Sequence, residues 1–91
     1  MNSFLTQPFL DCYRALPEHV RRQAQRNYQI WKDNPQHPSL QFKKVHGSEP
    51  IYSVRVGIGW RALGVVDSET NTIAWFWIGS HADYDRILKN L

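Results

Sequence analysis

The sequence predicts an α+β fold in a single domain that spans residues 1–91. Apolar residues recur every three or four positions up to residue 31, the period of a helix, and alternate with polar residues over 40–45 and 52–58, the period of a strand. The apolar run 73–78 indicates a strand that is covered on both faces. With 42% hydrophobic residues, the chain can form one compact core, and we expect the order helix, helix, four strands, helix.

Two amphipathic helices are expected first, joined into a hairpin. One begins near Pro8 and the other near Pro17, because proline suits the first turn of a helix, where a missing N–H group costs little. The sequence Asp33-Asn34-Pro35 ends the second helix. The apolar faces consist of Phe9, Cys12, Tyr13 and Leu16 in the first helix and of Val20, Ala24, Tyr28 and Trp31 in the second.

Four strands are expected to follow. Their ranges are 40–45, 52–58, 60–66 and 72–78. Gly57-Ile58-Gly59 is predicted to form a tight turn between the second and third strands, and residues 67–71 form the turn before the fourth.

The end of the chain is predicted to form a short helix whose first residue is His81. Gly79 is expected to stop the preceding strand, and Ser80 with Asp83 three residues later has the spacing of a capping box. His81 would then lie among the unpaired N–H groups of the first turn, where the helix dipole favours anions. We therefore expect the chemistry of the protein at this point.

Positive charge is concentrated in the middle of the chain. Residues 14–61 contain nine Lys and Arg against three acidic residues, whereas residues 62–91 carry a net charge of −2. This asymmetry points to nucleic acid or to an acidic partner. An ordinary solvated surface is the alternative, above all for Arg21, Arg22 and Arg26 on the second helix.

Composition argues against several other classes of protein. The single cysteine cannot form an internal disulfide, no apolar run approaches the ~20 residues of a membrane span, and the N-terminus lacks the layout of a signal peptide. We expect a cytoplasmic protein that does not act at a membrane. No metal site and no cofactor are expected, because the histidines are scattered and no dinucleotide-binding glycine loop occurs. The four histidines are His19, His37, His46 and His81.

Arg55 and Arg61 are expected to face each other across the glycine turn. This pairing follows if residues 57–59 form a three-residue loop, whereas a two-residue loop would send the two arginines to opposite faces. Like charges that pair across strands are destabilising unless an anion lies between them. The register therefore predicts phosphate binding, with ion pairs to nearby acidic residues as the structural alternative.

His81 and Tyr84 are the candidates for acid–base chemistry. Cleavage of RNA without a metal requires a base for the 2′-hydroxyl, an acid for the 5′-oxygen and cations for the charge that develops on phosphorus. His81 could be the base or the acid, and Tyr84 could assist it or stack on a nucleobase. The alternatives are a helix cap without catalytic duty for His81, and core packing of Tyr84 in a stripe with Leu88 and Leu91.

Several short stretches between residues 13 and 85 have an order and spacing that are specific as a set. They are Tyr13-Arg-Ala-Leu-Pro-Glu18, Asn34-Pro-Gln-His-Pro-Ser-Leu40 before Phe42-Lys-Lys-Val45, Tyr52-Ser-Val-Arg-Val56, Trp60-Arg-Ala-Leu63 and Trp77-Ile-Gly-Ser-His-Ala-Asp-Tyr-Asp85. With these stretches the chain resembles the RelE/ParE superfamily of toxins from bacterial type II toxin–antitoxin systems, and within it the RelE, YafQ and HigB-like branch.

The resemblance implies the fold of this superfamily, a twisted and mainly antiparallel sheet of three or four strands with the helical hairpin packed on one face and a short C-terminal helix. The N-terminal strand that is usual in this fold is expected to be short or missing, since Pro8 follows so soon.

The resemblance also implies a metal-independent ribonuclease that cleaves mRNA in the ribosomal A site and so inhibits translation. Its implied catalytic residues are His81, Arg61 and Tyr84, and its implied RNA- and phosphate-binding residues are Lys43, Lys44, Arg55 and His46. The implied partners are mRNA, the ribosome and a cognate antitoxin that lies over the basic surface.

Two other functions stay open at this stage. The ParE branch has nearly the same fold, inhibits DNA gyrase and needs no nuclease residues. A catalytically inactive binding module of the same fold is the third possibility. The ribonuclease is favoured because a gyrase inhibitor would gain nothing obvious from a cluster of Arg61, His81 and Tyr84.

Overall fold

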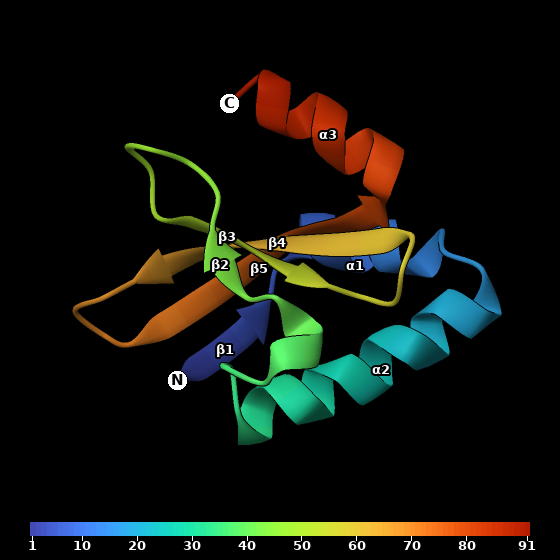
Figure 1. Ribbon diagram of the computed structural model, residues 1–91, viewed down its shortest axis with the longest axis horizontal. Coiled ribbons are helices and arrows are strands. Elements are labelled where there is room, and N and C mark those ends of the chain that lie inside the picture. Colours follow the sequence, from blue (N-terminus) through green and yellow to red (C-terminus); the bar gives the residue numbers. More distant parts are fainter.

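The computed structural model describes all residues, 1–91, and confirms the α+β fold (Figure 1). A five-stranded sheet has helices on both faces, and the strand order is β1-β5-β4-β3-β2. The strands are β1 (Asn2–Leu5), β2 (Lys43–Lys44), β3 (Ile51–Arg55), β4 (Trp60–Asp67) and β5 (Thr72–Ser80). The helices are α1 (Gln7–Arg14), α2 (Glu18–Asp33) and α3 (His81–Lys89), and a 3₁₀ turn, η1, covers Pro38–Leu40.

The sheet is mainly antiparallel, as expected, but it has one strand more than the three or four predicted. The N-terminal strand β1 is present and short, and it pairs in parallel with β5 at the edge of the sheet. Backbone bonds at both of its ends anchor it, from Asn2 N–H to Asn71 O (2.9 Å) and from Thr6 N–H to Trp75 O (3.1 Å). Its side chains show no apolar alternation, since only Ser3 is partly buried, which explains why the pattern could not predict it.

Three predicted boundaries are wrong. The expected strand 40–45 is reduced to Lys43–Lys44, because η1 places Leu40 in the core and Gln41 turns the chain with a left-handed φ of 47°. β3 ends at Arg55, before the glycine turn. Gly79 does not stop β5, since Gly79 pairs with Arg61 and the strand continues to Ser80.

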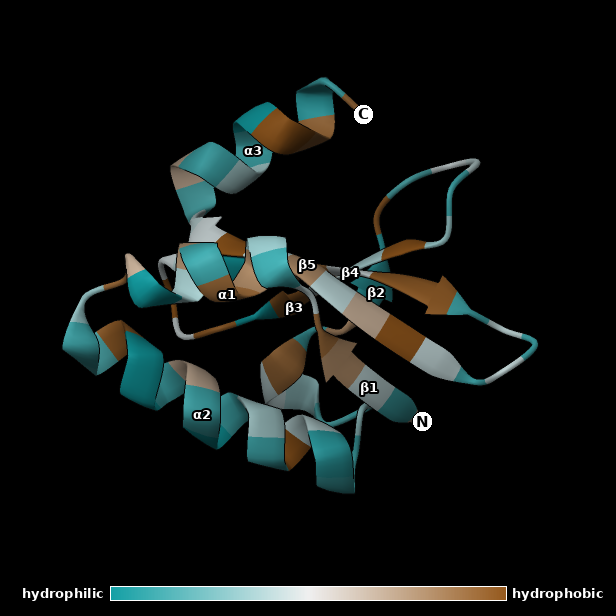
Figure 2. Cartoon of the chain, turned by 180° about the vertical axis from the view of Figure 1, so that it is seen from behind, coloured by the Kyte–Doolittle hydropathy of each residue, from teal (hydrophilic) through white to brown (hydrophobic).

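The helical hairpin and the C-terminal helix cover opposite faces of the sheet. Phe9 of α1 and Val20 and Trp31 of α2 belong to the main core cluster, whereas Tyr84 of α3 packs with Ile51 and Leu63 in a smaller second cluster. In Figure 2, hydrophobic segments run along β5, while much of α2 is hydrophilic. β5 is therefore covered on both faces, as its apolar run predicts.

A β-bulge in β5 explains how its large side chains reach both faces. Leu63 pairs with Trp77 and Gly64 pairs with Trp75, so Phe76 has no partner on β4. The extra residue keeps Trp75 and Ile78 in the main core although they are three positions apart.

None of the three helices combines the length and apolarity that a membrane span requires.

Gly64 of β4 has no room for a side chain, because side chains of β5 pack directly against it. A methyl group at this position would lie 2.7 Å from Ile73 Cδ1 and 2.9 Å from Trp75 Cε3. We expect Gly64→Ala to lower the free energy of unfolding by about 1–3 kcal/mol, because both neighbours lie in the core and have little room to move. Urea unfolding measures the change. Gly47→Ala, where a methyl group meets nothing within 4 Å, is the control. Equal unfolding midpoints for the two variants would contradict the tight packing at Gly64.

Candidate functional site

The β3–β4 turn has the three-residue loop that the sequence predicts. Val56 N–H donates to Trp60 O (2.9 Å), and Arg55 pairs directly with Arg61. Gly57 takes a φ of +68°, a conformation that side chains rarely adopt. The two arginines therefore extend from one face of the sheet, the face on which α3 lies, since Arg61 is two residues from Leu63 of the second core cluster.

Neither arginine has an acidic partner, because no carboxylate lies within 4.0 Å of the Arg55 or Arg61 guanidinium. Both turn back to the loop instead. Arg55 Nε donates to Gly57 O (3.3 Å), and Arg61 donates to the carbonyl oxygens of Trp60 (2.7 Å), Ile58 (3.3 Å) and Gly57 (3.4 Å). Partial burial and the Arg55 charge lower the pKa of Arg61 below its usual range. Arg55 and Arg61 therefore form a cationic site whose guanidinium groups are held by hydrogen bonds to carbonyl oxygens of the loop.

The start of α3 is fastened to this turn. Trp60 pairs with Ser80, and His81 N–H donates to Gly59 O (2.8 Å). Ser80 is the N-cap, and its hydroxyl accepts a hydrogen bond from Asp83 N–H (3.2 Å), so the predicted cap and the predicted position of His81 are confirmed. The imidazole of His81 is consequently held at the same end of the β3–β4 hairpin as the arginine pair.

The imidazole of His81 is about half exposed, and its Nδ1 lies 3.2 Å from Asp85 Oδ2. Asp85 was not among the residues that the sequence predicts for the site. Its spacing of four from His81 on an expected helix is the signal that could have found it, because such residues are neighbours on a helix surface.

Tyr84 lies below the site and not in it. The residue is only 6% exposed, and its hydroxyl donates to Ser53 Oγ (3.1 Å) inside the second core cluster. Its ring centroid is 5.7 Å from that of His81. The phenol oxygen is thus occupied in the core, while the ring supports the imidazole.

The basic residues of the second and third strands are divided between the two faces of the sheet. Lys43 pairs with Ser53 and so shares the face of Arg61, with roughly 12 Å between their Cα atoms from strand spacing. Lys44 pairs with Tyr52 and points to the other face, and both lysines are exposed. His46 lies in the loop before β3, at the opposite end of that strand from Arg55, and its Nδ1 accepts from Glu49 N–H (2.9 Å).

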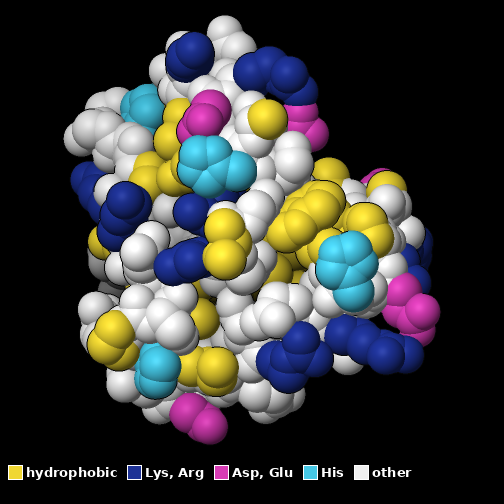
Figure 3. Space-filling model, turned by 45° about the vertical axis from the view of Figure 1, so that its right-hand side comes forward, with side chains coloured by type: hydrophobic (Ala, Val, Ile, Leu, Met, Phe, Trp, Pro, Cys, Tyr) yellow, Lys and Arg dark blue, Asp and Glu magenta, His cyan; other side chains and the backbone are white.

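The structure therefore brings Arg55, Arg61 and His81 together, with Lys43 on the same face. Figure 3 shows basic side chains gathered beside a histidine and an acidic side chain below α3. Lys44 and His46 lie outside this cluster.

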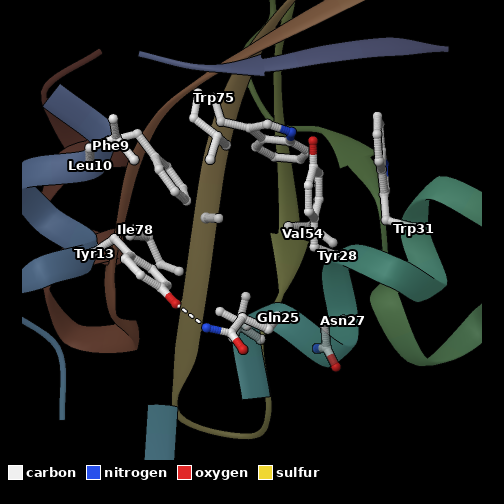
Figure 4. A pocket seen from close by; sticks show the side chains of 14 residues that line it. Phe9, Leu10, Tyr13, Gln25, Asn27, Tyr28, Trp31, Val54, Trp75 and Ile78 are labelled. Atoms are coloured by element: carbon white, nitrogen blue, oxygen red, sulfur yellow. Dashed lines mark hydrogen bonds between the residues drawn. The ribbon is translucent and has the colours of Figure 1, made fainter. Parts of the chain in front are cut away.

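A hollow lies between the helical hairpin and the sheet, away from the arginine pair (Figure 4). Its volume is about 220 Å³. Gln25 Nε2 donates to Tyr13 Oη (2.7 Å), which links α2 to α1 at this hollow. Nearly all lining residues are apolar and none is a Lys, Arg, His, Asp or Glu, so this hollow has no cation that could bind a phosphate group.

Known proteins show the same architecture. The family model of the ParE-like toxin domain matches residues 18–86. The RelE chain of a RelB–RelE antitoxin–toxin complex from Methanococcus jannaschii is similar in structure with a TM-score of 0.71 and 20% identity, over 91% of this chain and 96% of that one. The isolated RelE toxin of E. coli gives a TM-score of 0.66 and 17% identity, with coverage of 99% and 98%.

A toxin named YoeB/ParE from Agrobacterium tumefaciens gives a TM-score of 0.68 and 14% identity, over 89% of this chain and 99% of that one. No curated protein sequence matches the chain. At these identities the structural likenesses show the fold, whereas the family match extends over more than half of the chain. The chain therefore belongs to the ParE-like toxin domain family, and with it to the RelE/ParE superfamily of toxins.

Proposed function

We propose that this toxin is a metal-independent, ribosome-dependent mRNA endoribonuclease that inhibits translation. The observation that carries the proposal is the arginine pair, Arg55 and Arg61, which no carboxylate neutralises and which lies beside an exposed histidine. A purely structural pair of arginines would gain stability from an acidic neighbour, whereas a phosphate-binding pair must keep its charge available.

The site supplies the groups that transesterification of RNA needs. The 2′-hydroxyl loses its proton to a base and attacks the adjacent phosphorus, and the 5′-oxygen leaves with a proton from an acid. His81 supplies the imidazole that takes up or gives the proton, and Arg61 with Arg55 stabilises the charge on the phosphoryl oxygens. The reaction needs both a base and an acid, and the site offers one imidazole. We therefore expect the ribosome or the mRNA to contribute the second proton-transfer group.

The remaining predicted residues receive secondary roles in this proposal. Lys43 binds a neighbouring phosphate on the face of the arginine pair. Lys44 and His46 contact more distant parts of the RNA, because they lie outside the cluster. Tyr84 supports the His81 ring from the core and does not contact the substrate.

A protein antitoxin is the expected inhibitor. Two of the similar structures are complexes of a RelE toxin with RelB. We propose that the antitoxin of this chain covers the basic face with acidic side chains. The net charge of +3 on the toxin would attract such a partner and speed its association.

Because the matching family model is named for ParE, inhibition of DNA gyrase is the second candidate function.

Wild-type protein is expected to create new mRNA 5′ ends within translated codons when it is added to a bacterial translation extract. His81→Ala should slow cleavage by about 10²–10⁴-fold, because it removes the acid–base group. Arg61→Ala should slow it by about 10²–10³-fold, because it removes a cation from the developing charge. Mapping of 5′ ends over time measures both rates.

The matched controls are His19→Ala and Arg26→Ala, which remove exposed side chains of α2 and should leave the rate unchanged. Intact message at a concentration that is toxic in cells would refute the ribonuclease. Inhibition of gyrase supercoiling by the same protein would then identify the second candidate.

Arg55→Gln is expected to stabilise the free protein at low ionic strength by about 0.2–1 kcal/mol, since it removes a like charge opposite Arg61. The same variant should lose most of the stabilisation that phosphate gives the wild type. Urea unfolding with and without phosphate measures both effects, and Arg26→Gln is the control. A phosphate effect of equal size in Arg55→Gln would show that the pair does not bind the anion.

A further inference from the structure

The structure assigns a positioning role to Asp85, whose carboxylate holds the His81 imidazole so that Nε2 is presented to the RNA as the base. This inference rests on the proposed ribonuclease function. Asp85 lies one turn after His81 on α3, and its Oδ2 is 3.2 Å from His81 Nδ1. Both side chains are about half exposed, at 52% and 48%, so the pair lies at the surface where substrate can reach it.

The contact determines which ring nitrogen carries the proton. A neutral imidazole has one N–H donor and one acceptor, and a carboxylate can only accept. Nδ1 therefore keeps the proton when it faces Asp85, and the lone pair is left on Nε2. Without this partner the proton favours Nε2, as in free histidine, and Nε2 could then no longer accept a proton from a hydroxyl group.

Stability alone does not explain the pair. An exposed pair at i,i+4 on a helix contributes only about 0.3–0.5 kcal/mol. The second contact of the ring is with Tyr84, 5.7 Å between centroids, and Tyr84 is itself fixed by its hydrogen bond to Ser53. The imidazole is thus held between a carboxylate and a ring that is anchored in the core.

Asp85 also acts on the arginine pair. The charged and titratable groups around His81 are Asp85 and Tyr84 on α3, and Arg61 and Arg55 on the sheet. Burial and the charge of Arg55 lower the pKa of Arg61, whereas the carboxylate of Asp85 opposes that change. Asp85 therefore lies where one carboxylate influences both the imidazole and the nearer guanidinium, without an ion pair that would neutralise Arg61.

Nitrogen-15 NMR of the labelled full-length chain at a pH where histidine is neutral tests this role directly. In the wild type we expect the His81 proton on Nδ1, and in Asp85→Ala on Nε2. Asp85→Glu should restore the wild-type signature, because the longer carboxylate still reaches across one helical turn. Asp83→Ala is the matched control, since it removes a carboxylate of the same helix that pairs with Arg86 and not with His81.

The same variants are compared in the translation extract. Asp85→Ala should slow cleavage about tenfold to hundredfold, because the base remains but is no longer positioned. A positioned base contributes about 10²–10⁴-fold in all. Asp85→Glu should recover most of the lost rate. Circular dichroism of each variant checks that α3 is intact. A wild type that leaves mRNA uncut while Asp85→Ala moves the proton would support the positioning of His81 and refute the ribonuclease.

The reverse combination of results would refute the positioning role and leave the ribonuclease in place. If the wild type cleaves mRNA and the His81 proton stays on Nδ1 in Asp85→Ala, the positioning role is wrong whatever the cleavage rate, and the proposed ribonuclease stands. A shifted proton with unchanged cleavage would likewise overturn the assignment, because Nε2 would then not be the base.

Discussion

The register of the β3–β4 hairpin is the constraint on which the site depends. A three-residue turn sets Arg55 opposite Arg61, and the same ladder continues into β5, where Arg61 pairs with Gly79 and Trp60 with Ser80. Because Ser80 caps α3, the register also decides where that helix begins and where His81 lies. A slip of one residue in this register would send the two arginines to opposite faces and separate one of them from the imidazole. One turn thus determines the positions of both the arginine pair and the imidazole of His81.

Much of this arrangement could be predicted because it depends on neighbours in the sequence. The bounds of α2, the cap at Ser80 and the arginine pair follow from local rules of capping, periodicity and turn length. β1 could not be predicted from periodicity, because its parallel pairing with β5 is made by residues about 70 positions away. The alternatives for Tyr84 could not be separated either, since its hydrogen bond to Ser53 joins α3 to a strand far back in the chain.

The two faces of the sheet differ in role, since one carries most of the hydrophobic core and the other carries the candidate site. The helical hairpin covers the larger cluster of aromatic and aliphatic side chains, and the hollow between the hairpin and the sheet is lined mainly by apolar residues and carries no charge. α3 covers a much smaller cluster, and Ile58 in the turn of the β3–β4 hairpin is 84% exposed. Burial of apolar side chains on the hairpin face therefore provides most of the stability. The other face can hold two like charges and an exposed imidazole, because their repulsion lowers the free energy of unfolding by only a part of its total.

The shortness of β2 has a consequence for the behaviour of the protein in solution. An edge strand exposes unpaired backbone groups to which a strand of another molecule can add, and lysine at the edge is a common protection against this. β2 has only two residues, and both are exposed lysines. This short, charged edge disfavours pairing between copies of the toxin, so replacing Lys43 and Lys44 with apolar residues would promote aggregation.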